Sequence, residues 1–104
     1  IISAKEDVLT IESGAAKNPE LSKIYFFGFI EKETRIKLIK NHIAELKILC
    51  SDLEKICDKG KTLSKEMENN DIFFYQLQTA IYGRDLIKFN IEWYNHLLKN
   101  LRSN

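Results

Sequence analysis

The sequence predicts an all-α fold, and three observations support this prediction. The 104 residues contain one proline and four glycines, which leaves long stretches free of helix breakers. Apolar side chains recur at alternating spacings of three and four residues, which is typical of one side of a helix. The one run that could form a buried strand, residues 26–30, has no second strand to pair with. We expect two long antiparallel helices preceded by short leading helices.

The longest predicted helix covers residues 65–102 and contains no proline, and the polar residues 62–71 at its start form either a loop or a frayed first turn. Its first apolar row alternates between spacings of three and four residues, and Arg84 is the interruption. A second row covers a neighbouring face, so the helix needs burial on several sides. The first row is Phe73, Leu77, Ala80, Ile87, Ile91, Tyr94, Leu98 and Leu101, and the second row is Tyr82, Leu86, Phe89, Trp93 and Leu97.

A second long helix is predicted over residues 31–59, where we expect Gly60 to act as a left-handed cap. Cys50 and Cys57 fall within its apolar row and should behave as small apolar side chains. Seven residues of helix separate them by roughly 10 Å, which is too far for a mutual disulfide. The row is Ile36, Ile39, Ile43, Leu46, Cys50, Leu53 and Cys57.

The segment before the long helices carries two helix-start signals. Residues 3–6 have the form of a capping box, which predicts a short helix within residues 1–13. Asn18, Pro19 and Glu20 predict a second start, because they supply a cap, a first-turn proline and a first-turn acid. This helix should end near Gly28. We divide the chain into a connecting helix and loop, residues 1–16, and a helical domain, residues 17–104.

Two long helices from one chain cannot cover both apolar rows of the last helix. Burial of one Leu or Phe side chain contributes about 1.5–3 kcal/mol, so uncovered rows favour association. We therefore expect a homodimer, and hence a dimeric helical bundle. The predicted interface residues are Ile87, Ile91, Tyr94, Leu98 and Leu101, although the spacing does not decide which row faces the partner chain.

Charge and composition argue against several classes of function. The net charge is +1 and no basic stripe is present, so the chain itself offers no nucleic-acid surface. No apolar run approaches the roughly 20 residues of a membrane span, and no secretory signal is visible. Free thiols then favour a cytoplasmic location. The chain lacks a Gly-rich phosphate loop, paired catalytic carboxylates and clustered zinc ligands. We expect no enzymatic activity and no cofactor.

Two motifs in order along the chain resemble one family. Residues 17–28 end in Phe-Phe-Gly, and the last helix carries Tyr82-Gly83 followed by Glu92-Trp93. This order is similar to the C-terminal domain of PadR-type transcriptional regulators, in the subgroup with a virulence-activator-alpha-like C-terminal domain. The resemblance covers about residues 17–101.

The resemblance implies a helical domain that forms a homodimer and spaces two winged helix-turn-helix heads on a near-palindromic operator. It implies that residues 1–16 lead from a winged helix domain that this chain lacks, so that DNA would be bound only through that missing domain. Many members respond to small aromatic molecules, which makes Phe89, Trp93 and Tyr94 a candidate effector pocket. The simpler alternative is that these rings fill space in a core or interface. The alternative function is a free-standing helical protein–protein interaction module with no DNA role.

Overall fold

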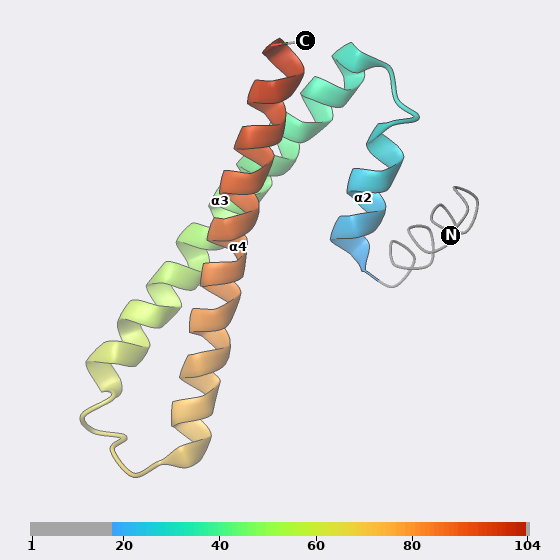
Figure 1. Cartoon of the computed structure of the whole chain (residues 1–104). Coiled ribbons are helices and arrows are strands. Elements are labelled where there is room, and N and C mark those ends of the chain that lie inside the picture. The colour runs from blue at the N-terminus through green and yellow to red at the C-terminus, as the bar shows by residue number, and fades with distance from the viewer. Residues whose placement is uncertain (1–17, 104) are drawn as a thin grey trace, which may run out of the picture. The chain divides into compact units, whose positions relative to one another are not determined.

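The computed structural model describes residues 18–103, and it describes side chains up to Leu101. Three helices make up this part of the chain: α2, Pro19–Phe27; α3, Lys32–Leu63; and α4, Asp71–Ser103 (Figure 1). Residues 18–103 contain no strand, which confirms the predicted all-α class. The helix expected within residues 1–13 lies outside the described residues. The chain forms two compact units, residues 1–35 and 36–104, which are described separately below.

Helix α2 begins and ends where the sequence predicts. The Asn18 side chain accepts hydrogen bonds from the backbone N–H groups of Glu20 and Leu21, at 2.9 and 3.4 Å. Pro19 occupies the first turn, where a missing N–H costs nothing. Gly28 is the C-cap, with right-handed helical φ and ψ of −65° and −20°. The cap signals in the sequence therefore suffice to define this helix.

The last turn of α2 and the residues just after it form a small aromatic cluster within the first unit. The rings of Tyr25, Phe26 and Phe29 lie with centroids 5.0 to 5.9 Å apart. The guanidinium of Arg35 donates a hydrogen bond to the carbonyl of Ile30 at 2.8 Å. This bond ties the start of α3 to the connection before it, which shows how the run from Phe26 to Ile30 is accommodated without a strand.

Helices α3 and α4 run antiparallel and pack along most of their length (Figure 1). His42 contacts Tyr94 near one end of the pair, and Gly60 lies against Leu77 near the other. The predicted row of α3 supplies most of the core between them. The buried hydrophobic residues are Ile39, Ile43, Leu46, Cys50, Cys57, Tyr94 and Leu98.

The connection between the two long helices differs from the prediction. Helix α3 does not end at Gly60 but continues to Leu63, and no described glycine has a positive φ. Gly60 is buried, and a Cβ atom there would fall well inside van der Waals contact with Leu77. This glycine therefore serves a close helix approach and not a left-handed cap.

The last helix begins six residues later than expected, at Asp71. The side chain of Asn70 accepts a hydrogen bond from the backbone N–H of Phe73 at 3.0 Å, which is an N-cap interaction. Asn69, immediately before it, adopts a left-handed φ of 70° that breaks the helical path. The polar stretch after α3 therefore forms turns, because its asparagines favour them.

Candidate protein–protein interface

The first apolar row of α4 faces α3 within the same chain. Tyr94 is 1% exposed and Leu98 is 8% exposed. The Tyr94 ring packs edge-on against His42 of α3, with centroids 4.8 Å apart. Both side chains therefore pack in the core of one chain, and their contact with a second chain stays a prediction. Ile87, Ile91 and Leu101 are partly buried in the same row, and their contact with a second chain stays a prediction.

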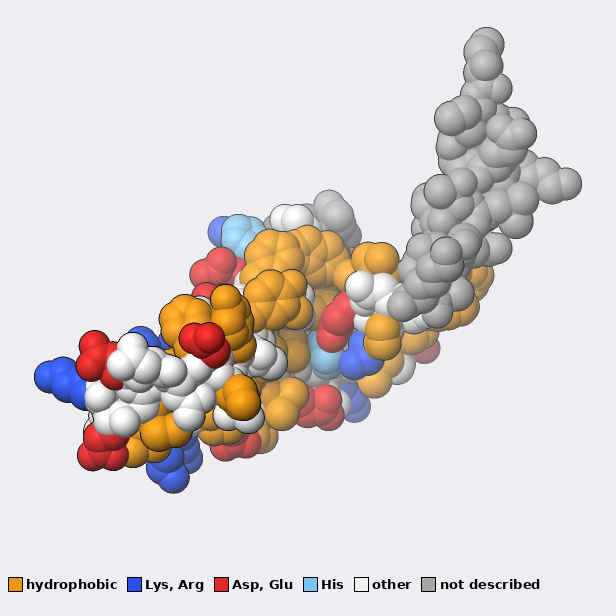
Figure 2. All heavy atoms as spheres, turned by 90° about the horizontal axis from the view of Figure 1, so that it is seen from below, with side chains coloured by type: hydrophobic (Ala, Val, Ile, Leu, Met, Phe, Trp, Pro, Cys, Tyr) orange, Lys and Arg blue, Asp and Glu red, His pale blue; other side chains and the backbone are white. Residues whose placement is uncertain are grey.

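The second row of α4 remains largely uncovered. Tyr82 is 71% exposed, Phe89 59%, Leu86 46% and Trp93 38%. Tyr75, seven residues before Tyr82, extends this row towards the start of the helix. Figure 2 shows hydrophobic side chains gathered in patches on the face that is in view. A helix that leaves so many large side chains in water has a free surface that favours a partner.

Between Ile72 and Leu97, the charged side chains of α4 lie away from the second row. Tyr75 and Trp93 are eighteen residues apart, which is about five full turns, so they mark one line along the helix. Each residue of a helix is rotated by about 100° from the one before it. Among the charged residues between Ile72 and Leu97, Asp85 lies nearest to this line, and its rotation from the line around the helix axis is roughly 80°. The second row is therefore free of Asp, Glu, Lys and Arg over about seven turns.

Two contacts define the two sides of the helical pair. A Cβ atom at Gly83 would lie 3.6 Å from the Leu53 side chain, so α3 and α4 approach each other there. On the other side, the Lys88 ammonium lies 3.0 Å from the Glu54 carboxylate. Leu53 and Glu54 are consecutive residues, and they flank the buried row of α3 on opposite sides. One side of the pair is therefore apolar and the other carries an ion pair.

The exposed residues of α3 extend the apolar side. Leu49 and Ile56 lie one turn before and after Leu53, and they are 51% and 53% exposed. Leu86 lies one turn after Gly83 on α4. Because Leu53 meets Gly83, these side chains lie on the same side of the pair. We call this surface the apolar face, and it consists of Leu49, Ile56, Tyr82, Leu86, Phe89 and Trp93.

Two cations of α4 have partners outside the apolar face. The Arg84 guanidinium, which interrupts the first row, lies 3.0 Å from the carboxylate of the adjacent Asp85. This hydrogen bond raises the pKa of Arg84 above its ordinary value. The hydrogen bond and charge of Glu54 likewise raise the pKa of Lys88. In both contacts the neighbouring carboxylate favours the charged form of the cation.

The three residues predicted as an effector pocket do not form one open site. Phe89 and Trp93 are exposed, whereas Tyr94 is buried. The Trp93 ring packs edge-on against Tyr94, with centroids 5.3 Å apart. Since Tyr94 also contacts His42, these rings form a continuous path from the apolar face to α3. An aromatic molecule could reach Trp93 and Phe89 but not the Tyr94 ring.

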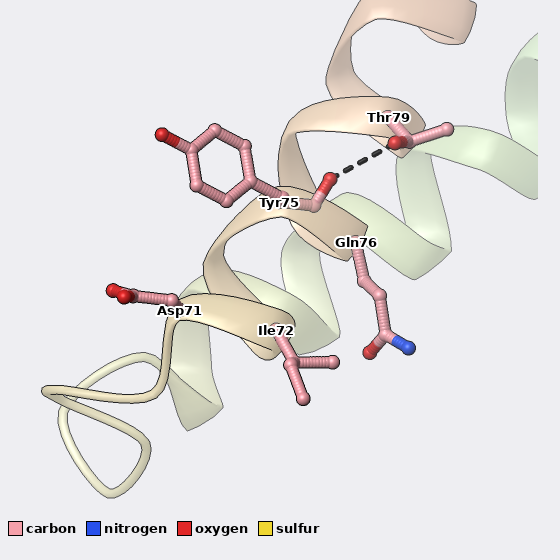
Figure 3. A pocket seen from close by; sticks show the side chains of 5 residues that line it. All are labelled: Asp71, Ile72, Tyr75, Gln76 and Thr79. Carbon is pink, nitrogen blue, oxygen red and sulfur yellow. Dashed lines mark hydrogen bonds between the residues drawn. The ribbon is translucent and has the colours of Figure 1, made fainter.

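Two surface hollows lie elsewhere, near the start of α4. One has a volume of about 440 Å³ and is built from the first turns of the helix, with the Thr79 hydroxyl bonded to the Tyr75 carbonyl at 2.9 Å (Figure 3). The other, of about 520 Å³, lies at the α3–α4 connection beside Asn70 and Phe73. Neither is lined by Phe89, Trp93 or Tyr94. Both hollows are shallow, because each is lined mostly by residues that are close together in the sequence.

Neither a metal cluster nor a membrane span is found in the described part of the chain. Among residues 18–103 no group of three or more His, Cys, Asp or Glu side chains could hold a metal ion. No helix in the same range is long and apolar enough to cross a membrane.

The described residues therefore form an all-helical domain in which two long helices pack together and leave one apolar face exposed. A family described as virulence activator alpha C-term matches residues 16–102. Because the match covers most of the chain, the protein belongs to this family. No curated protein and no solved structure matches the chain. The family description indicates a regulatory helical domain.

Proposed function

We propose that the chain is the dimerisation domain of a PadR-like transcriptional regulator that acts in the cytoplasm. Family membership and the order of the Tyr82-Gly83 and Glu92-Trp93 motifs support the regulatory role. One observation carries the dimer: a single chain leaves the large hydrophobic side chains of the apolar face in water. The role is one of assembly and requires no catalytic group.

The size of the apolar face suits a specific interface. A large aromatic side chain presents about 150–250 Å² when fully exposed. Tyr82 and Phe89 are more than half exposed, and Leu86, Trp93, Leu49 and Ile56 are exposed by 38% to 53%. Together they offer on the order of 500 Å² per chain, so a two-fold interface would bury about 1,000 Å² in total, which is the lower bound for a specific interface.

The mechanism of such a domain is indirect. Two copies joined through α3 and α4 would hold two DNA-binding heads at a fixed separation, which must match the spacing of an operator's half-sites. A change in the angle between the copies would then alter operator affinity. Any ligand that binds one arrangement better than the other shifts the population towards that arrangement.

Operator-dependent repression provides the test of this function. The chain is fused to a helix-turn-helix head that binds its palindromic operator only as a dimer, in place of that head's own dimerisation domain. We expect repression of a reporter gene by the fusion. Leu86→Glu should abolish repression, because it places like charges opposite each other in a two-fold interface. Ser51→Glu, an exposed α3 position outside the apolar face, is the matched control and should repress normally. Failure of the unsubstituted fusion to repress, with the fusion present at normal levels, would contradict the proposal.

Effector sensing is a second role that the aromatic path from Trp93 to Tyr94 and His42 favours. Trp93 is the single tryptophan of the chain, so its fluorescence reports on this site alone. A small aromatic effector that stacks on Trp93 and Phe89 should quench or shift this emission in a saturable manner. Phe89→Ala should weaken the response. The absence of any saturable change across a panel of planar aromatic compounds would argue for a purely structural Trp93.

A free-standing interaction module remains the alternative function. It shares the apolar face but has no DNA-binding head. The coding sequence upstream of Ile1 discriminates the two: a helix-turn-helix and wing support the regulator, and an initiator methionine directly before Ile1 supports the module.

A further inference from the structure

We propose that a second copy of α4 crosses this chain at Gly83, so that the two-fold axis of the dimer passes close to this residue. This inference rests on the proposed dimer, and it adds which residue of α4 lies where the two copies cross. Packing within the single chain does not require a glycine at position 83.

Gly83 lies in the interior of the 33-residue helix α4. Glycine weakens a helix interior relative to alanine, because it adds backbone freedom to the unfolded chain. Within the chain, a Cβ atom at Gly83 would meet only the Leu53 side chain, at an ordinary contact distance of 3.6 Å. Gly60 is different, because a Cβ atom there would clash with Leu77. Internal packing therefore requires the glycine at 60 but not the glycine at 83.

The position of Gly83 suggests what requires it. It lies between the exposed Tyr82 and the uncovered Leu86 one turn on, beside Leu53 of α3. The missing side chain leaves a notch on the apolar face. The distance between two packed helices depends on the side chains at their contact point, so a glycine permits the closest approach. A helix from outside the chain fits this notch.

The distribution of the second row favours a second copy of α4 as that helix. Gly83 lies eight residues after Tyr75 and ten before Trp93, so along the helix axis it is level with the middle of the exposed row, and it is turned about 80° from that row towards α3. A two-fold axis at the middle of the row buries both halves equally, because the same patch serves both copies. The row carries no Asp, Glu, Lys or Arg, so it can face itself without like-charge repulsion.

Replacement of the glycine tests the crossing. Gly83→Ala should keep or raise the melting temperature of the dilute monomer, because alanine favours the helix and has room beside Leu53. It should raise the dimer dissociation constant at least tenfold in sedimentation experiments. Ser51→Ala, also a gain in helix propensity but outside the apolar face, should leave the dissociation constant unchanged.

Crosslinking provides an independent measurement of the same geometry. Tyr82→Cys lies next to the proposed axis, so a short bismaleimide should join two copies efficiently. Tyr75→Cys should not crosslink, because an antiparallel crossing at Gly83 separates the two thiols by about 24 Å along the helices. Cys50 and Cys57 are buried and are present in both variants, so any crosslinking through them is the same in both experiments.

The outcomes separate this inference from the proposed function. Weak dimerisation of Gly83→Ala together with crosslinking at position 82 supports the crossing. A stable wild-type dimer that Gly83→Ala leaves intact, or that crosslinks equally at position 75, overturns the crossing while the dimer stands. A wild-type chain that remains monomeric overturns the proposed dimer and this inference with it.

Discussion

Removal of the Tyr94 ring tests whether the first row of α4 holds one chain together. Tyr94 is 1% exposed and contacts both His42 and Trp93. Replacement of a fully buried aromatic side chain by alanine costs about 3–5 kcal/mol, which is a large share of the 5–15 kcal/mol that stabilises a typical domain. With a urea dependence of about 1.5 kcal/mol per molar, Tyr94→Ala should lower the unfolding midpoint by about 2–3 M.

Urea unfolding followed by circular dichroism, at 1 and 100 μM protein, measures this loss. The free-energy difference between Tyr94→Ala and wild type should be the same at both concentrations, because the ring is buried within one chain. Trp93→Ala is the matched comparison. It should cost the single chain less, because this side chain is 38% exposed. A Tyr94→Ala loss below about 1 kcal/mol, or one that grows with protein concentration, would refute the intrachain placement.

Two further predictions concern the ends and the polar side of the helical pair. Gly60→Ala should lower the free energy of unfolding by about 1–2 kcal/mol, since overpacking against Leu77 outweighs the gain in helix propensity; an unchanged thermal midpoint would show that Leu77 moves aside at little cost. Lys88→Met should destabilise the chain at neutral pH. Glu54 raises the pKa of Lys88 in the folded state, so the contribution of the pair is present below the unfolded pKa and disappears as the pH rises through the raised pKa. A difference in melting temperature that persists at strongly alkaline pH would contradict an electrostatic origin.

The sequence predicts the long helices because their apolar spacing follows directly from helical geometry. The row from Ile36 to Cys57 becomes the buried side of α3, with Ile36 and Leu53 only partly buried. The start of α2 follows from local capping chemistry that needs no tertiary contact. These features depend on neighbours within a few residues, and periodicity is sufficient to find them.

Features that depend on contacts between helices could not be read from spacing. Two rows on α4 have similar periodicity, and the structure alone shows that Tyr94 rather than Trp93 faces α3. Gly60 has the sequence context of a helix cap, and only its contact with Leu77 explains why the helix continues. The ion pair between Lys88 and Glu54 likewise joins residues from separate helices.

The molar mass of the chain in solution tests the central claim that the apolar face joins two copies. Light scattering at micromolar concentration should give twice the mass of the chain for wild type. Leu86→Glu should give the mass of a single chain with unchanged helical circular dichroism, because Leu86 is 46% exposed and its replacement leaves the intrachain core intact. A wild-type protein that stays monomeric up to 100 μM, or a Leu86→Glu variant that remains fully dimeric, would contradict the account.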